Sequence, residues 1–196
     1  MTARLDDSAL DQLFRGARSH NGWKSDALPE ATLRELYEIA RFGPTAANTS
    51  PARFVFVTSV EAKAKLASVS SGANQAKIKA APATVIIGYD LDFPDHMNVL
   101  FPHRPGIKAL FSEPTAAEHV AFRNASLQGA YLMIAARALG LDCGPMSGFE
   151  NGKVDALFFA ETRIRSNFIC SIGHGDGTNL FDRLPRLSFE DACTVV

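Results

Sequence analysis

The chain of 196 residues is long enough for one well-buried domain and short for two, so we expect a single domain over residues 1–196. Its composition, 46% hydrophobic and 21% charged, is typical of a globular protein rather than a disordered or fibrous one. The balance of 20 basic and 21 acidic residues, without a secretory signal or a long apolar run, predicts a cytoplasmic protein that binds neither nucleic acid nor membrane.

Predicted helices and strands alternate along the chain. Asp7 or Ser8 caps a first helix, whose apolar residues follow one helical face as far as Ala17, and a second helix begins at Pro29 and ends at Gly43. The other predicted elements are, in chain order, a strand from Arg53, helices from Glu61 and over 75–80, a strand over 83–90, an irregular segment over 92–112, a helix over 114–139, a strand near Leu141, a helix over 154–158, a strand over 167–173 and a terminal turn capped by Ser188. Connections of mixed length favour an α+β fold over a regular doubly wound sheet.

The helix predicted over 114–139 is apolar around much of its circumference. Phe122, Leu127 and Tyr131 do not fall on one narrow face, which is typical of a helix that is covered on most sides. In a domain of this size, a second subunit is the simplest cover. We therefore expect a homodimer with this helix at the two-fold interface.

Several common enzyme classes lack their signatures here. The sequence has no G-x-G-x-x-G dinucleotide turn, no phosphate-binding P-loop and no G-x-S-x-G elbow, since Ser147 stands in GPMSGF. The five histidines form no HExxH pair, and the three cysteines are too widely spaced for a zinc or dithiol motif. We expect buried free thiols and no metal.

Three segments are more distinctive than ordinary surface. ARSHNGW, over 17–23, combines an arginine with short polar side chains. RFGPTAANTSPARF, over 41–54, has small residues that leave room for a flat ligand. GLDCGPMSGFE, over 140–150, has glycines that let the backbone approach a ligand closely. Each segment alone is equally consistent with a structural turn.

Together these segments resemble the nitroreductase family over nearly the whole chain. The shared motifs are a basic segment at Arg18, P-[ST]-x-x-N-x-x-P over 44–51, N-x-x-K at Asn74 and Lys77, P-x-x-G-F over 145–149 and R-L-P over 183–185. Within the family, SHNGW, GPTAANTSPARFVF, LFPH, FRNASLQGAYL, GPMSGF and RLPRLSFEDA most resemble the RutE- and HadB-type malonic semialdehyde reductases (3-hydroxypropanoate dehydrogenases) of pyrimidine breakdown. The resemblance implies an α+β nitroreductase-like fold, with a central mixed β-sheet surrounded by helices in an intertwined homodimer.

The resemblance also implies a tightly but non-covalently bound FMN at the subunit interface, with NAD(P)H as a transient co-substrate. The residues it assigns to FMN are Arg18, Ser19, His20, Asn21, Pro44, Thr45, Ala46, Asn48, Asn74, Lys77, Pro145, Met146, Ser147, Gly148, Arg183 and Arg186. Arg18 and Arg183 would clamp the phosphate, a task suited to the forked guanidinium, with Arg186 either assisting or exposed. His20 would contact the ribityl and phosphate end.

The other implied contacts concern the flavin ring. Asn74 and Lys77 would lie at the pyrimidine edge, where a cation stabilises the charge of reduced flavin; alternatively, Lys77 is a solvated helix charge. The turn over 44–48 would reach the ring from the other subunit. The loop over 145–148 would pack along one face, with a backbone N–H aimed at N5. The chain departs from the family at 21–23, where relatives often carry a second cation, and at Ser147, where many carry Glu.

Three functions remain open from the sequence. The first is reduction of malonic semialdehyde to 3-hydroxypropanoate by ping-pong hydride transfer through flavin N5, with no catalytic side chain assigned with certainty. A small-molecule electrophile of this kind needs a cation for its carboxylate, and the candidates are Arg104, Lys108 and Arg123, each also explained as plain surface charge. The second is a broad nitro- or quinone reductase, and the third is a flavin-binding protein without useful turnover. The sequence leaves the choice of NADH or NADPH open.

Overall fold

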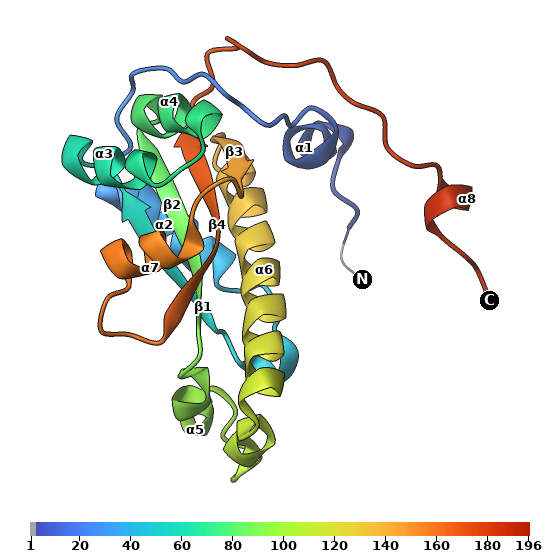
Figure 1. The fold of residues 1–196 in the computed structure, drawn as a ribbon. Helices are drawn as coiled ribbons and strands as arrows, with labels where there is room; N and C mark the ends of the chain where they lie inside the picture. The colour runs from blue at the N-terminus through green and yellow to red at the C-terminus, as the bar shows by residue number, and fades with distance from the viewer. Residues whose placement is uncertain (1–2) are drawn as a thin grey trace.

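A four-stranded sheet organises the computed structural model, which describes residues 3–196 (Figure 1). Its strands are β1 (Ala52–Val57), β2 (Ala83–Asp90), β3 (Asp142–Met146) and β4 (Ile164–Gly173), in the order β1-β2-β4-β3. All three strand pairings are antiparallel, so the mixed sheet that we expected is not formed by these strands. The parallel element among the described residues is one isolated bridge, between Ser19 and Cys143. The order of helices and strands in the sequence does not determine strand direction. The α+β class is confirmed.

The predicted helices and strands are all present, with small shifts at their ends. The helices and helical turns are α1 (Asp7–Leu10), the π-helical turn η1 (Asp11–Arg15), α2 (Glu30–Ala40), η2 (Ala46–Asn48), α3 (Val60–Ser68), α4 (Gly72–Ala80), η3 (Phe93–His96), α5 (Met97–Leu100), η4 (Ile107–Phe111), α6 (Pro114–Ala138), α7 (Asn151–Phe158) and α8 (Phe189–Ala192). The segment over 92–112, expected to be irregular, contains three short helical turns, the first of which includes Pro94.

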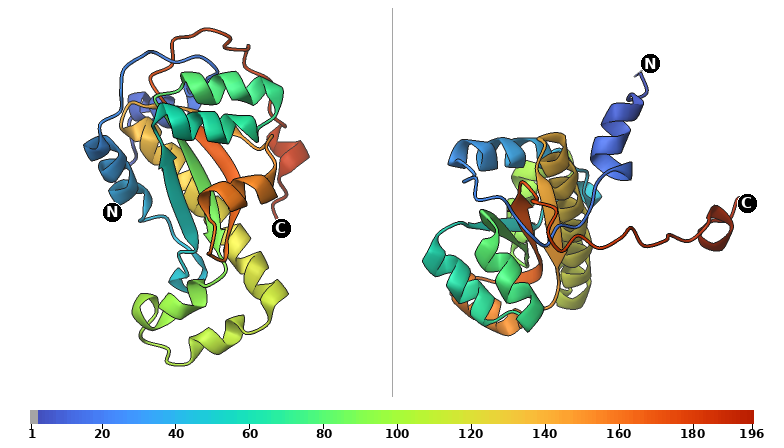
Figure 2. Two further views of the ribbon diagram at one scale, coloured as in Figure 1. Left: turned by 60° about the vertical axis from the view of Figure 1, so that its left-hand side comes forward. Right: turned by 90° about the horizontal axis from the view of Figure 1, so that it is seen from above.

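Helices cover both faces of the sheet. Because successive side chains of a strand point to opposite faces, Val85 and Ile87 of β2 lie in one core and Ile86 lies in the other. The first core contains Leu36 of α2 and Leu132 of α6. The second core lies under α3, α4 and α7. The sheet is therefore the middle layer of three (Figures 1 and 2).

The long helix α6 is covered on one side only within a single chain. Its buried residues include Ala125, Leu132 and Ala136, whereas Phe122, Leu127 and Tyr131 are exposed. Apolar residues therefore occupy much of the circumference of α6, as expected, and part of that apolar surface lacks cover within residues 3–196. This leaves a surface suited to a partner.

Two parts of the chain extend beyond the layered body. The segment over 91–112 forms a lobe at one end of α6, and it has its own small core around Phe93, Met97 and Ile107. The C-terminal tail leaves the body and carries α8 well away from the sheet (Figures 1 and 2). All its residues from 181 onward are exposed.

No helix within residues 3–196 is long and apolar enough to cross a membrane. Over the same residues, His, Cys, Asp and Glu side chains form no group of three or more that could hold a metal ion.

Candidate functional site

The two ends of the chain lie side by side. Residues 15–24, which begin at the last residue of η1, run antiparallel to residues 174–183, which follow β4. We call these paired segments the ladder. Three side chains donate to carbonyls across it: Arg183 Nη2 to Arg15 and Ala17, at 2.6 and 3.0 Å, Arg18 Nη2 to Phe181, and Asn21 Nδ2 to Asn179 at 2.7 Å. Two backbone N–H groups also donate across it, Asp176 to the Gly22 carbonyl at 3.4 Å and Lys24 to the His174 carbonyl at 2.8 Å. Segments from opposite ends of the sequence thus bring Arg18 and Arg183 together.

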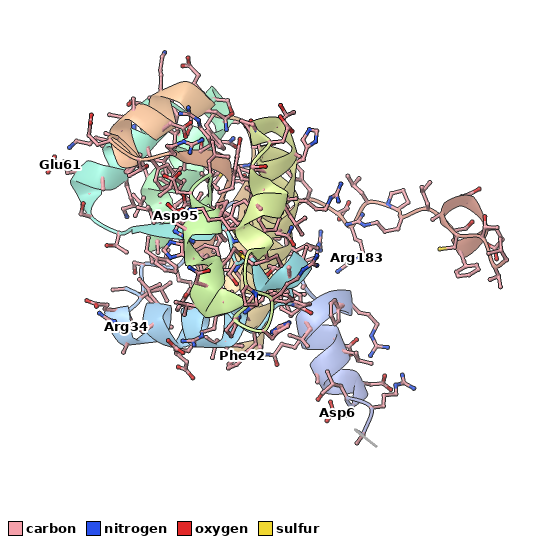
Figure 3. The ribbon with its side chains drawn as sticks, turned by 90° about the horizontal axis from the view of Figure 1, so that it is seen from below. Asp6, Arg34, Phe42, Glu61, Asp95 and Arg183 are labelled. Carbon is pink, nitrogen blue, oxygen red and sulfur yellow. The ribbon has the colours of Figure 1, made fainter. Side chains whose placement is uncertain are left out.

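A cavity of about 820 Å³, which we call the arginine cavity, opens where these segments meet α6. It is lined by Phe14, Arg15, Ala17, Arg18, Ser19, Arg137, Phe181, Asp182, Arg183, Leu184 and Arg186. The lining contains five arginines against one carboxylate, although the whole chain carries a net charge of −1. Such a local excess of guanidinium groups suits a phosphate or another anion. Figure 3 shows Arg183 on the tail between the body and α8.

One wall of the cavity holds a donor without an acceptor. The Nε atom of Arg137, in the last turn of α6, is buried and has no hydrogen-bond partner within residues 3–196. Its Nη1 donates to the Leu13 carbonyl at 3.1 Å, which ties η1 to α6. A buried unpaired donor is costly, so an anion that accepted from Arg137 would gain from its presence.

His20 faces away from this cavity. Its side chain is 12% exposed, and Nε2 lies 3.2 Å from Oδ1 of Asp142, the first residue of β3. The other carboxylate oxygen of Asp142 accepts from the Gly175 N–H at 2.8 Å. His20 therefore packs against the base of the ladder, whereas its neighbour Ser19 lines the cavity.

A second group of predicted residues meets at the far end of β3. Asn74 of α4 donates through Nδ2 to the Gly148 carbonyl at 3.1 Å, and the N–H of Ser71 donates to the same carbonyl at 2.8 Å. A Cβ on Gly148 would lie 2.6 Å from Ser71 Oγ, so this close approach requires glycine. Lys77, also on α4, is half-buried, and no hydrogen bond or ion pair engages its ammonium within the described part of the chain.

The neighbours of Gly148 in this loop point in different directions. Pro145 and Ser147 are exposed, whereas Met146 is buried in the core beneath α3, α4 and α7. The Met146 side chain therefore supports the loop from below. The exposed backbone around Ser147 and Gly148 is the part of this loop that a ligand can reach.

The turn over 44–48 lies far from the arginine cavity within one chain. The buried Asn124 of α6 accepts from the Ala46 N–H at 2.7 Å, and the Asn48 side chain donates to the Leu100 carbonyl at 2.8 Å. Thr45 Oγ1 accepts from the Ser50 N–H at 3.1 Å, and Pro44 is exposed. Because Asn124 and Arg137 are 13 residues apart on α6, the turn and the arginine cavity lie roughly 20 Å from each other.

The comparisons identify the family of this arrangement. Residues 14–174 match the model of the nitroreductase family. The chain belongs to the nitroreductase family. A Caulobacter vibrioides protein named as an NADH dehydrogenase/NAD(P)H nitroreductase is 63% identical over 194 residues, covering 99% of this chain and all of the relative. A Ralstonia pickettii protein named as NADH dehydrogenase/NAD(P)H nitroreductase HadB is 56% identical, with both chains fully covered.

A solved structure supports the fold. It is described as a nitroreductase in complex with FMN from Exiguobacterium sibiricum, and it superposes with a TM-score of 0.86 over the full length of both chains at 21% identity. At this identity the likeness concerns the fold, and the nitroreductase-like fold is thereby confirmed for this chain.

Of the candidate substrate cations of this nitroreductase-family chain, Arg104 and Lys108 precede α6, and Arg123 lies near the middle of α6 beside Asn124, which holds the turn over 44–48. Lys108 is already paired with Asp95. Arg104, in the lobe over 91–112, and Arg123, on α6, are exposed, and neither has a side-chain partner within residues 3–196. The structure therefore leaves two of the three candidates available for an anion.

Two groups have strongly shifted pKa values, and neither lies in the arginine cavity. A hydrogen bond with the Cys143 thiol and burial hold the pKa of Cys170 well above its usual value, so the Cys170 thiol stays protonated in the core. Burial, with a hydrogen bond to Glu118, raises the pKa of Tyr89 to about 12. Cys143 and Cys170 are buried as expected, whereas Cys193 is exposed.

Sequence reasoning missed three residues of this site. Arg15 and Arg137 line the arginine cavity, and Asp142 contacts His20. A cation in the last turn of a helix is ordinarily explained by the helix dipole, and nothing in the sequence relates Arg137 to residues 15–18. Asp142 stands within the distinctive segment over 140–150, but its partner lies more than 100 positions earlier in the chain.

A hollow larger than the arginine cavity lies elsewhere. It has a volume of about 1100 Å³ and lies between α2 and the outer edge of β1, and its lining includes Tyr37, Phe54 and Phe56. None of the residues that line it belongs to the predicted site. We place the site at the arginine cavity because the charged groups converge there.

Gln128 of α6 supports the turn that leads into β1, and its loss should destabilise the fold. Its Oε1 accepts from the Ala52 N–H at 2.8 Å in a buried position. Gln128→Leu leaves this donor unpaired, so we expect the free energy of unfolding to fall by about 1–3 kcal/mol, measured by urea denaturation. Gln75→Leu, which removes a donor to the Ser70 carbonyl from a half-buried position, should cost less; an equal or greater cost would contradict this.

Proposed function

We propose that this chain is an FMN-dependent oxidoreductase that consumes NAD(P)H, built from one domain and acting as a cytoplasmic homodimer. The arginine cavity is the observation that carries this proposal. Five arginines from both chain ends and α6 surround a space that suits the phosphate of a mononucleotide. The FMN in the Exiguobacterium sibiricum structure and the NAD(P)H in the relatives' names support the choice of cofactor and co-substrate.

The residues present fit FMN at both ends. Arg18 and Arg183 would hold the phosphate, with Arg137 and Arg186 in the same lining. The backbone around Ser147 and Gly148, together with Asn74 and Lys77, would hold the ring. Bound FMN supplies the hydride chemistry for which no side-chain group is needed. The protein's part is to bind, orient and place a cation near the ring, a role that the half-buried Lys77 can fill.

The distance between the turn over 44–48 and the arginine cavity supports an FMN site that is formed by two subunits. The turn over 44–48 lies roughly 20 Å from the arginine cavity in one chain, so a second copy packed against α6 would bring Thr45, Ala46 and Asn48 closer to the same FMN. The exposed Leu127 and Tyr131 of α6 supply apolar surface for such a dimer. We propose that each site is completed by the partner's turn and lobe.

For the physiological acceptor we propose malonic semialdehyde, reduced to 3-hydroxypropanoate. Arg104 lies in the lobe before α6 and Arg123 lies beside Asn124, which holds the turn that would approach the partner's FMN, and either arginine can meet the carboxylate of a small anionic aldehyde. The name of the Ralstonia pickettii relative HadB, which is 56% identical, does not specify a substrate. The word nitroreductase in the relatives' names favours a second candidate, a broad nitro- or quinone reductase.

Steady-state kinetics tests this proposal. The purified protein should be yellow, with the absorption of oxidised flavin. Initial rates of NADH and NADPH oxidation should give parallel double-reciprocal lines, because donor and acceptor use the same place in turn. We expect kcat/KM for malonic semialdehyde to exceed that for a nitroaromatic by at least roughly tenfold, which is about 1.4 kcal/mol of transition-state binding.

The other outcomes separate the alternatives. If kcat/KM for the aldehyde is no better than for the nitroaromatic, the broad reductase is the better description. Flavin binding without turnover of any acceptor would indicate a flavin-binding protein. A colourless protein that takes up no added FMN would overturn the proposed function itself.

A further inference from the structure

One carboxylate connects the two segments that carry the paired arginines. Asp142 contacts His20 from the N-terminal segment through one oxygen and the Gly175 N–H from the C-terminal segment through the other, at 3.2 and 2.8 Å. Arg18 stands two residues before His20, and Arg183 stands eight residues after Gly175. We call His20, Asp142 and Gly175 the junction.

The junction is packed too closely to be an accidental surface contact. A Cβ on Gly175 would lie 1.9 Å from His20 Nδ1, so the imidazole lies directly against the Gly175 backbone. A Cβ on Gly144 would lie 2.5 Å from the His20 carbonyl, and one on Gly22 would lie 2.0 Å from Thr178 Oγ1. Three glycines therefore permit the close approach of three segments here, and His20 itself is largely buried.

The junction is also where the ladder joins the sheet. The His20 N–H donates to the Cys143 carbonyl at 2.9 Å, which forms the isolated parallel bridge to β3. Beyond this point the tail that carries Arg183 is held mainly by the segment that carries Arg18, and Gln12 and Arg137 tie that segment to α6 through η1. The tail is exposed from residue 181 onward. The contacts of Asp142 are therefore the last side-chain link between the rigid β3 strand and both arginine-bearing segments.

We propose that Asp142 is a positioning residue for anion binding in the arginine cavity. By holding His20 and Gly175 at fixed places, its carboxylate sets the spacing of Arg18 and Arg183 so that both guanidinium groups reach one phosphate. This inference rests on the proposed FMN binding, and it adds a role for a residue that does not line the arginine cavity itself. Misplacement of either arginine would cost phosphate affinity without changing contacts to the flavin ring.

FMN and riboflavin differ only by the phosphate, and this difference gives the test. Full-length protein stripped of flavin is titrated with each ligand, and quenching of flavin fluorescence is followed. Asp142→Ala should weaken FMN binding at least about tenfold while riboflavin affinity changes less than about twofold. Asp142→Asn keeps one acceptor oxygen, so it should recover part of the lost FMN affinity. His20→Ala in the Asp142→Ala background should add little, because the two residues act as one unit.

Asp155→Ala is the matched control. Asp155 on α7 also accepts a backbone N–H, from Ser166 at 2.7 Å, but it lies away from the ladder. This variant should leave the ratio of FMN to riboflavin affinity unchanged. Melting temperatures of all variants without flavin show whether each is folded; if Asp142→Ala does not fold, Asp142→Asn and His20→Ala carry the comparison and should each lower the ratio.

The possible results separate the positioning role of Asp142 from phosphate binding in the arginine cavity. If Asp142→Ala weakens FMN and riboflavin equally, or leaves both unchanged, the positioning role is wrong while the proposed flavin function stands. If the wild-type protein binds FMN no better than riboflavin, the arginine cavity does not bind the phosphate. That second result would overturn both the proposed use of the cavity and the role of Asp142.

Discussion

Replacing Arg18 and Arg183 together by alanine is expected to lower FMN affinity by roughly two to four orders of magnitude. Each charge-assisted hydrogen bond contributes about 1.5–3 kcal/mol, and tenfold in affinity corresponds to about 1.4 kcal/mol. Both guanidinium groups line the arginine cavity, and they come from segments that lie side by side in the ladder. The dissociation constant of FMN, measured on flavin-free protein, checks this result.

Both arginines also tie the two chain ends together, and this second role has to be separated from phosphate binding. Arg183 donates to the carbonyls of Arg15 and Ala17, and Arg18 donates to the carbonyl of Phe181. Loss of these contacts alone would loosen the ladder and affect riboflavin as well. A loss confined to FMN identifies the phosphate as the ligand of the two arginines. Arg18→Lys keeps the charge but not the fork, so it should give an intermediate loss.

The matched control removes two arginines that lie outside the cavity. Arg34 pairs with Glu30 on α2, and Arg163 pairs with Asp92 at 2.8 Å, both on the exposed surface. Arg34→Ala with Arg163→Ala changes the net charge by the same amount and should leave FMN affinity within about threefold of the wild type, because exposed pairs contribute little. An equal loss in both double variants would show a general effect of charge and would count against the phosphate clamp.

Local sequence patterns were sufficient to predict the elements of the fold. The helix over 114–139 has caps, periodicity and length that leave few alternatives, and it is found at Pro114–Ala138. The continuous apolar run of β2 similarly predicts a strand, and this strand is buried on both faces. Strand direction could not be predicted, because it depends on how distant segments pair rather than on the residues of each segment. The mixed sheet that the family resemblance implied is not formed by the four strands of one chain, which all pair antiparallel.

The site was predictable only where its residues stand close together in the sequence or form a family motif. Arg18 and Arg183 came from the resemblance, and the structure adds that their segments run antiparallel. His20 was assigned to the cofactor, but its ring is turned toward Asp142. Side-chain direction at such a position depends on neighbours 100 or more residues away, which local patterns do not contain. Whether these residues bind FMN is still a prediction.

A charge on the exposed face of α6 is expected to abolish the dimer and, with it, the FMN site. Leu127 is 46% exposed in the single chain. Leu127→Glu would place a carboxylate inside the proposed two-fold interface, where an unpaired charge costs several kcal/mol. We expect a monomer by light scattering and loss of bound flavin at concentrations where the wild type is a yellow dimer. Flavin is lost because the turn over 44–48 no longer reaches the partner's arginine cavity.

Leu157→Glu provides the control with the same chemistry. Leu157 of α7 is also 46% exposed, but it lies on the opposite face of the sheet from α6. This variant should remain a flavin-loaded dimer. If both variants lost the dimer and the flavin, the introduced charge would have a general effect that does not depend on its position. A Leu127→Glu protein that stays dimeric would place the interface elsewhere. A monomer that keeps FMN would show that one chain holds the cofactor alone, which contradicts a site divided between the turn of one subunit and the arginines of the other.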